Sequence, residues 1–460
     1  HLFARVAILA WDYLFRSADP DMALNNWDTL VGQLQDPLRH FRELQFQPKR
    51  LSLLLDIFAS SQFLSNVLNR HPELFDWATS PAVVHRDRNE STLRSELAVD
   101  EKSSDDEESF MIRLRLFRFR EILRIGTRDI CLGVPIESVV GDLSAVARSV
   151  LDTTLTFAWR RWKEEESASG GTPAKVDPER FCILAFGKLG GNELNYSSDL
   201  DLLAVYEAGD SGSPEVTAAY SQIMKQLRHL ATATTTAGNA YRIDMRLRPF
   251  GSAGLLVSPV EAVERYYADQ AENWERQALL KLAPVAGNLE VGSRLLERLR
   301  SEILAVDPPE KLRRSISEMR QASTDRLGDV LDVKDGVGGL RDIEFVVQGI
   351  QLLLAREHPE LITGNTLQAL NLFTEKKVLD ADLCEELRRD YVFLRRIEHF
   401  LQIMEDRQVH AIPPDPAYRS ALEKRLVKTG SLSGGLETEL EATRRRSRRS
   451  FDRFIDGRLP

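Results

Sequence analysis

The chain is poor in cysteine, lacks long apolar runs and has no excess of positive charge. Its 460 residues hold only three cysteines, the widely spaced Cys131, Cys182 and Cys384. So few and scattered cysteines argue against a disulfide framework and fit a reducing, cytoplasmic setting. None of them lies in a cluster with histidine, which argues against a zinc site. No apolar stretch approaches the roughly twenty residues of a membrane span. A formal net charge of −9 argues against sequence-independent binding to nucleic acid.

The remaining composition is that of an ordinary globular protein. Hydrophobic residues make up 43% and charged residues 28% of the chain, which is long enough for a large core. Apolar residues recur at three- and four-residue spacing in both flanks, which predicts helices there. We expect an α+β fold that is predominantly helical: an N-terminal helical region at 1–165, a catalytic domain with a small mixed sheet at 175–300, and a C-terminal helical bundle at 305–460.

A glycine-rich turn followed by two aspartates is the most informative feature. Strands are expected at 181–186 and 200–206, with Asp199 and Asp201 at the start of the second. Residues i and i+2 of a strand share a face, so the two carboxylates repel each other unless a cation lies between them. Hard oxygen ligands beside a flexible glycine turn favour Mg²⁺, or Mn²⁺, and a nucleotide phosphate. Alone, an aspartate pair on a strand is usually a solvated face or a turn.

A third carboxylate is expected from the segment 241–251. Four charged residues alternate there with apolar ones: Arg242, Asp244, Arg246 and Arg248. A single strand would place all four on one face, which cannot be an ordinary core face, although an exposed ion-pair network would give the same pattern. We expect Asp244 to join the aspartate pair at the metal, and the last two arginines to offset phosphate charge.

The order of glycine turn, aspartate pair and third carboxylate resembles the nucleotidyltransferase pattern of the polymerase-β-like superfamily. Lys188 departs from that pattern, where glycine or serine is usual. Either Gly190 and Gly191 take over the phosphate role, or Lys188 adds a charged contact. The predicted catalytic and metal-binding residues are Asp199, Asp201 and Asp244. The predicted nucleotide-binding residues are Gly187, Lys188, Gly190, Gly191, Ser198, Arg246 and Arg248.

Four longer segments resemble glutamine synthetase adenylyltransferase, also called the adenylyl-transferring and adenylyl-removing enzyme. They keep the order of that family and lie at 187–201, 245–249, 274–278 and 338–345. The resemblance implies a nucleotidyltransferase that acts on a tyrosine of glutamine synthetase and so controls nitrogen assimilation. It also implies ATP or ADP and phosphate as small substrates, and a PII signal protein as regulator.

Members of that family usually carry two nucleotidyltransferase halves. One removes AMP by phosphorolysis, taking up phosphate and releasing ADP, and the other adds AMP from ATP. This chain has one motif set and begins with His1, so we expect one half. Segment 195–198 and Arg341 resemble the removing half, which we predict. Segments 277–278 and 254–257 resemble the transferring half, which stays an alternative, as does a regulatory nucleotide-binding module without turnover.

Further elements are predicted around these motifs. We expect a loop at 167–173, a helix near 215–237 and another strand near 255–258. Segment 334–344 is expected to border the site through Lys334, Arg341, Asp342 and Glu344, although Asp342 could simply favour the start of a helix. His399 is predicted to be a packed residue, and 444–449 a solvated helix face or a contact to the missing half.

Overall fold

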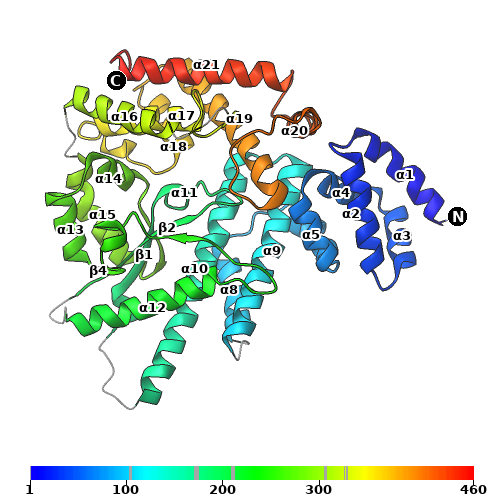
Figure 1. Ribbon diagram of the computed structural model, residues 1–460, viewed down its shortest axis with the longest axis horizontal. Helices are drawn as coiled ribbons and strands as arrows, with labels where there is room; N and C mark the ends of the chain where they lie inside the picture. Colours follow the sequence, from blue (N-terminus) through cyan, green and yellow to red (C-terminus); the bar gives the residue numbers. More distant parts are fainter. Residues whose placement is uncertain are drawn as a thin grey trace.

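Helices surround a small sheet in the computed structural model, which describes residues 2–102, 106–169, 176–208, 213–304, 308–325, 327 and 330–460 (Figure 1). This arrangement confirms the predicted α+β, mainly helical class. Most buried apolar side chains of the described residues form one cluster that runs from Val6 to Leu459. None of the described helices is long and apolar enough to cross a membrane.

Ten helices make up the described part of the N-terminal region. They are α1 (Leu2–Arg16), α2 (Pro20–Gln33), α3 (Pro37–Phe46), α4 (Pro48–Ser60), α5 (Gln62–Arg70), α6 (Leu74–Ala78), α7 (Pro81–Val84), α8 (Glu90–Lys102), α9 (Glu107–Leu132) and α10 (Ile136–Ser169). Local sequence fixes their ends: Asp19 and Asp36 cap α2 and α3 with proline in the first turn, and Gly133 ends α9 with φ of +58°. Helix α10 takes up 167–169 of the predicted loop, and 170–175 lie outside the described residues.

The sheet has five described strands: β1 (Phe181–Ala185), β2 (Leu200–Tyr206), β3 (Ile243–Asp244), β4 (Val257–Pro259) and β5 (Ala283–Gly287). Strand β1 lies between β2 and β5 and is antiparallel to both, whereas β3 and β4 both pair in parallel with β2. Every residue of β1 is buried, since α10 packs on β5, and α15 (Leu289–Leu304) packs on β1 and β5. The predicted strands at β1, β2 and β4 are confirmed.

Further helical segments connect the strands: η1 (Pro178–Arg180), α11 (Gly187–Gly190), α12 (Pro214–Thr232), η3 (Gly251–Ala253), α13 (Val260–Asp269), α14 (Asn273–Ala278) and η4 (Leu279–Lys281). The helix predicted to reach 237 ends at Thr232. Its end is fixed from another helix: the buried Arg115 of α9 donates to the carbonyls of Leu230, Ala233 and Gly238.

The described C-terminal part contains α16 (Pro309–Thr324), α17 (Leu340–Leu354), η5 (Pro359–Leu361), α18 (Thr366–Glu375), α19 (Ala381–Glu405), α20 (Pro416–Lys428) and α21 (Leu436–Ile455). Helix α19 packs against α5, α10, α18, α20 and α21, and so joins the two helical flanks. Its His399 is buried between Asp129 and Asn195, which confirms the prediction that this histidine is packed.

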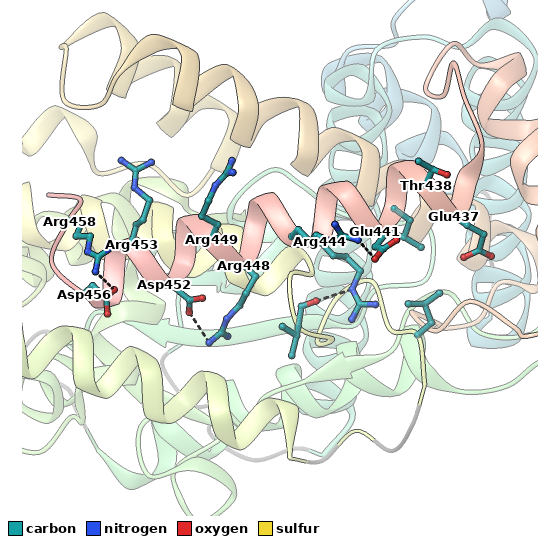
Figure 2. A pocket seen from close by; sticks show the side chains of 14 residues that line it. Glu437, Thr438, Glu441, Arg444, Arg448, Arg449, Asp452, Arg453, Asp456 and Arg458 are labelled. Atoms are coloured by element: carbon teal, nitrogen blue, oxygen red, sulfur yellow. Dashed lines mark hydrogen bonds and ion pairs between the residues drawn. The ribbon is translucent and has the colours of Figure 1, made fainter.

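The arginine-rich helix α21 borders a hollow of about 820 Å³ away from the sheet, shown in Figure 2. Its arginines meet acidic side chains and carbonyls: Arg445 pairs with Glu441, Arg448 with Asp452, and Arg444 donates to the Val337 carbonyl. Arg445 and Arg449 are exposed, in keeping with a solvated helix face.

Candidate active site

The three predicted carboxylates meet at one cleft of about 560 Å³. Asp201 lies on β2 and Asp244 on β3, where parallel pairing places them opposite each other, and Asp199 directly precedes β2. Residues from distant segments complete the wall, among them Lys188, Lys334 and Arg341. The structure therefore brings together the three residues that the sequence spacing singles out.

The turn after β1 passes directly beneath this cluster. The Phe186 amide donates to the Asp201 carbonyl at 2.8 Å, and Gly187 then adopts φ of +60°. A Cβ at Gly187 would lie 2.8 Å from Asp201 Oδ2. Glycine is required here both by the left-handed backbone and by the approach of the carboxylate. Gly187 and Ser198 both line the cleft.

Gly190 and Gly191 lie where the backbone packs closely. Neither lines the cleft, where a phosphate contact would have to lie. A Cβ at Gly190 would overlap the carbonyl oxygens of Lys281 and Ala185, and one at Gly191 would overlap that of Gly364. These glycines allow close backbone packing behind the site, and their predicted place in the phosphate pocket stays a prediction.

Lys188 lies in the cleft but already has a partner. Its Nζ donates to Glu398 of α19 at 2.8 Å. Burial lowers the pKa of Lys188 to about 7, although the charge of Glu398 opposes the shift. Its predicted phosphate contact stays a prediction.

The arginine pattern is not a strand face. Strand β3 is only two residues long, so the predicted single strand with all four charged residues on one face is wrong. Arg242 donates to Asp199 Oδ1 at 2.5 Å, and Arg246 binds Asp244 with contacts of 2.6–3.1 Å. The Arg248 guanidinium is turned away and donates to three carbonyls of its own turn, those of Met245, Ser252 and Gly254.

The two paired aspartates leave Asp201 without a compensating contact. Burial, together with the charges of Asp244 and Asp199, raises the pKa of Asp201 to about 6. The hydrogen bonds from Arg246 instead lower the pKa of Asp244. Among the described residues, no group of three acidic, histidine or cysteine side chains has metal-binding geometry, because Asp199 and Asp244 face guanidinium groups. Three carboxylates of this kind do suit a hard divalent cation chemically, once the arginines turn aside.

Some side chains of the segment 334–344 line the cleft, and one lies in the core. Lys334, Arg341 and Glu344 line the cleft as expected. Asp342 does not, because it is fully buried and binds Arg320 and the Gly338 amide. Its role is structural, the alternative that the sequence left open.

Sequence reasoning missed several residues of the cleft wall, notably Lys281 of η4, Gln348 of α17, Gln402 of α19 and His410. Lys281 pairs with Glu193 at 2.7 Å, and His410 lies 3.0 Å from Glu398. These residues belong to segments far from the aspartates in sequence, and no local motif marks them.

Three aspartates gathered on adjacent strands beside a glycine turn, on a small mixed sheet, define a nucleotidyltransferase. The family model described as glutamate-ammonia ligase adenylyltransferase matches residues 51–298, just over half the chain. The chain belongs to that family, as its motifs indicate. A second model, GlnD PII-uridylyltransferase, matches residues 310–455.

Relatives described as bifunctional glutamine synthetase adenylyltransferase/adenylyl-removing enzyme are similar over most of the chain. The protein of Methylococcus capsulatus is 33% identical over 428 residues, 89% of this chain and 45% of the relative. Those of Chromobacterium violaceum and Pseudomonas aeruginosa are 35% and 36% identical over 81% and 70% of this chain, and 40% and 34% of their own lengths. The chain thus spans less than half the length of these relatives.

Proposed function

We propose that this chain removes AMP from a tyrosine of glutamine synthetase by phosphorolysis, with phosphate taken up and ADP released. The observation that carries the proposal is the cleft itself, where three aspartates face a ring of cationic side chains. Both are needed to bring an anionic nucleophile to a phosphodiester. The names of the relatives support glutamine synthetase as the protein substrate.

In this proposal the aspartates bind the metal and the arginines bind the phosphates. Asp199, Asp201 and Asp244 would hold Mg²⁺, or Mn²⁺, which when bound supplies Lewis-acid stabilisation of charge on the phosphorus oxygens. In the metal-free state Arg242 and Arg246 neutralise two of these carboxylates. With a metal ion bound to the carboxylates, the two arginines would be free to bind phosphate oxygens.

The second substrate, inorganic phosphate, would bind to cationic side chains of the segment 334–344. Lys334 has no acidic side chain within ion-pair distance in the described structure, and Arg341 holds Asp335 at 2.7 Å. An ammonium group that is not paired with a carboxylate supports binding of a further anion.

The opposite direction, addition of AMP from ATP, is the second candidate. It is favoured by Gln277, which resembles the transferring half, lines the cleft and donates to Gln348 at 2.7 Å. An amide pair of this kind would suit the base or ribose of a nucleotide in either direction.

The match of residues 310–455 to the PII-uridylyltransferase model supports a PII signal protein as regulator. The three cysteines are free, which supports a cytoplasmic location.

A paired assay with Mg²⁺ tests the direction. One tube contains adenylylated glutamine synthetase and phosphate, and the other contains unmodified glutamine synthetase and labelled ATP. ADP release in the first tube alone is the expected result, and label transfer in the second alone would reverse the assignment. Nucleotide binding without turnover in either tube would instead favour a regulatory module.

A further inference from the structure

His410 lies in the cleft that holds the three aspartates and is the only imidazole on its described wall. Its backbone is fixed by a short pairing between two segments: the Val333 amide donates to the His410 carbonyl at 2.9 Å, and Asp332 and Ala411 form a bridge. The side chain is 14% exposed, with a buried Nδ1. Most of the ring is therefore enclosed, while the rest of it borders the cleft.

A buried carboxylate holds this imidazole from behind. His410 Nδ1 lies 3.0 Å from Glu398 Oε1, an ion-pair contact rather than a linear hydrogen bond. Burial opposes ionisation of Glu398, but the charges of Lys188 and Arg395 and the contact with His410 together outweigh burial, and the pKa of Glu398 falls well below its usual range. An ionised carboxylate at Nδ1 favours the proton on that nitrogen and leaves Nε2 to exchange a proton with a substrate.

Such a group would speed the reaction. The conjugate acid of a tyrosine phenolate has a pKa of about 10, so the phenolate leaves phosphorus faster when a proton reaches its oxygen in the transition state. Imidazole is the side chain best able to give and regain a proton near neutral pH. Lys281, by contrast, is held protonated, because Glu193 raises its pKa against the effect of burial.

We propose, on the basis of the AMP removal proposed above, that His410 is the general acid that protonates the departing tyrosine oxygen, with Glu398 as its positioning residue. A phosphate oxygen attacks the α-phosphorus of AMP, the bond from that phosphorus to the tyrosine oxygen breaks, and the phenolate takes the proton from His410 Nε2. The hydrogen phosphate that attacks gives up its own proton as ADP forms, which restores the imidazolium through solvent. No net proton is consumed.

The test compares two leaving groups on one protein substrate. Glutamine synthetase is prepared with tyrosine or with tetrafluorotyrosine at the modified position and is adenylylated in both forms. The fluorinated phenolate is a much weaker base and leaves without a proton. His410→Gln should lower kcat for the tyrosine form by about 10²- to 10⁴-fold, and for the fluorinated form by less than about 10-fold.

A matched control separates this role from folding or docking. His358→Gln alters another histidine, one outside the cleft that is paired with Glu360, and should leave both rates unchanged. Equal loss on both substrates in His410→Gln would show a structural role and overturn the proposal. No loss on either would also overturn it. Absence of turnover by the unsubstituted chain on both substrates would overturn the AMP-removing function itself.

Discussion

Two aspartates, Asp129 in the helical scaffold and Asp201 in the cleft, have opposite electrostatic surroundings. Asp129 of α9 is buried and binds Arg396, the Tyr196 hydroxyl and His399. Burial opposes its ionisation, but the charge of Arg396 and the contacts with His399 and Tyr196 together outweigh burial and lower the pKa of Asp129. Asp201 instead faces two other carboxylates, and its pKa is raised to about 6. Paired acids hold the scaffold together, whereas an acid left with excess negative charge marks a place for a cation.

The largest expected effect is the loss of AMP turnover when carboxylates of the cleft are removed. The double substitution Asp199→Asn with Asp201→Asn should lower AMP turnover by at least about 10³-fold, because the amides cannot hold a divalent ion or the charge of the reaction. Circular dichroism should show an unchanged fold. Retained turnover by the folded double variant would contradict the metal assignment.

Breaking a pair on the scaffold side should instead cost stability. Arg396→Met leaves Asp129 as a buried carboxylate without its main counter-charge, so the free energy of unfolding should fall by about 3–5 kcal/mol. Denaturant melts measure this loss. The exposed pair of Arg39 and Glu43 provides the control, since Arg39→Met should leave the melt almost unchanged. Similar behaviour of the two variants would show that buried pairing is not what stabilises the scaffold.

A smaller effect is expected from the glycine that packs behind the cleft. Gly190→Ala forces a methyl group against the carbonyls of Lys281 and Ala185, and should destabilise the fold by about 1–3 kcal/mol. Gly32, exposed in α2 with open space around it, is the matched site, where alanine should be neutral or stabilising. A stable Gly190→Ala variant with weakened nucleotide binding would instead support the predicted phosphate role.

The smallest expected effect is a change in stability when the negative charge of Asp201 is removed. Because its folded pKa is raised, the metal-free protein loses stability as the pH rises through about 6. Asp201→Asn should therefore stabilise the metal-free protein at pH 7 by about 1–2 kcal/mol, and have little effect at pH 4. Thermal melts without metal measure both values. A variant that is equally stable or less stable at pH 7 would argue against repulsion in the cluster.

The same protonation should weaken metal binding in the unsubstituted chain. The Mg²⁺-induced rise in melting temperature should decline below about pH 6, where Asp201 takes up a proton. A rise that stays constant down to pH 5 would place the ion elsewhere.

Local patterns predicted β1, β2 and the three aspartates because each depends on neighbours within a few residues. Strand β5 was not predicted, since it contains Pro284 and ends in glycine, and only its pairing with β1 holds it extended. The alternation around Asp244 suggested a long strand, but Arg248 is drawn into a turn by three carbonyls. An alternation of charged and apolar residues therefore does not by itself predict a strand.

The sequence by itself determined the family, the helical flanks and the three carboxylates, because glycine turns, strand alternation and helical periodicity are short-range properties. Only the tertiary structure decided which cation meets which acid. Glu398 lies some two hundred residues from Lys188 in the chain, yet it binds both that lysine and His410. Such pairings arise from the packing of α19 beside the turn, and no spacing along the chain encodes them.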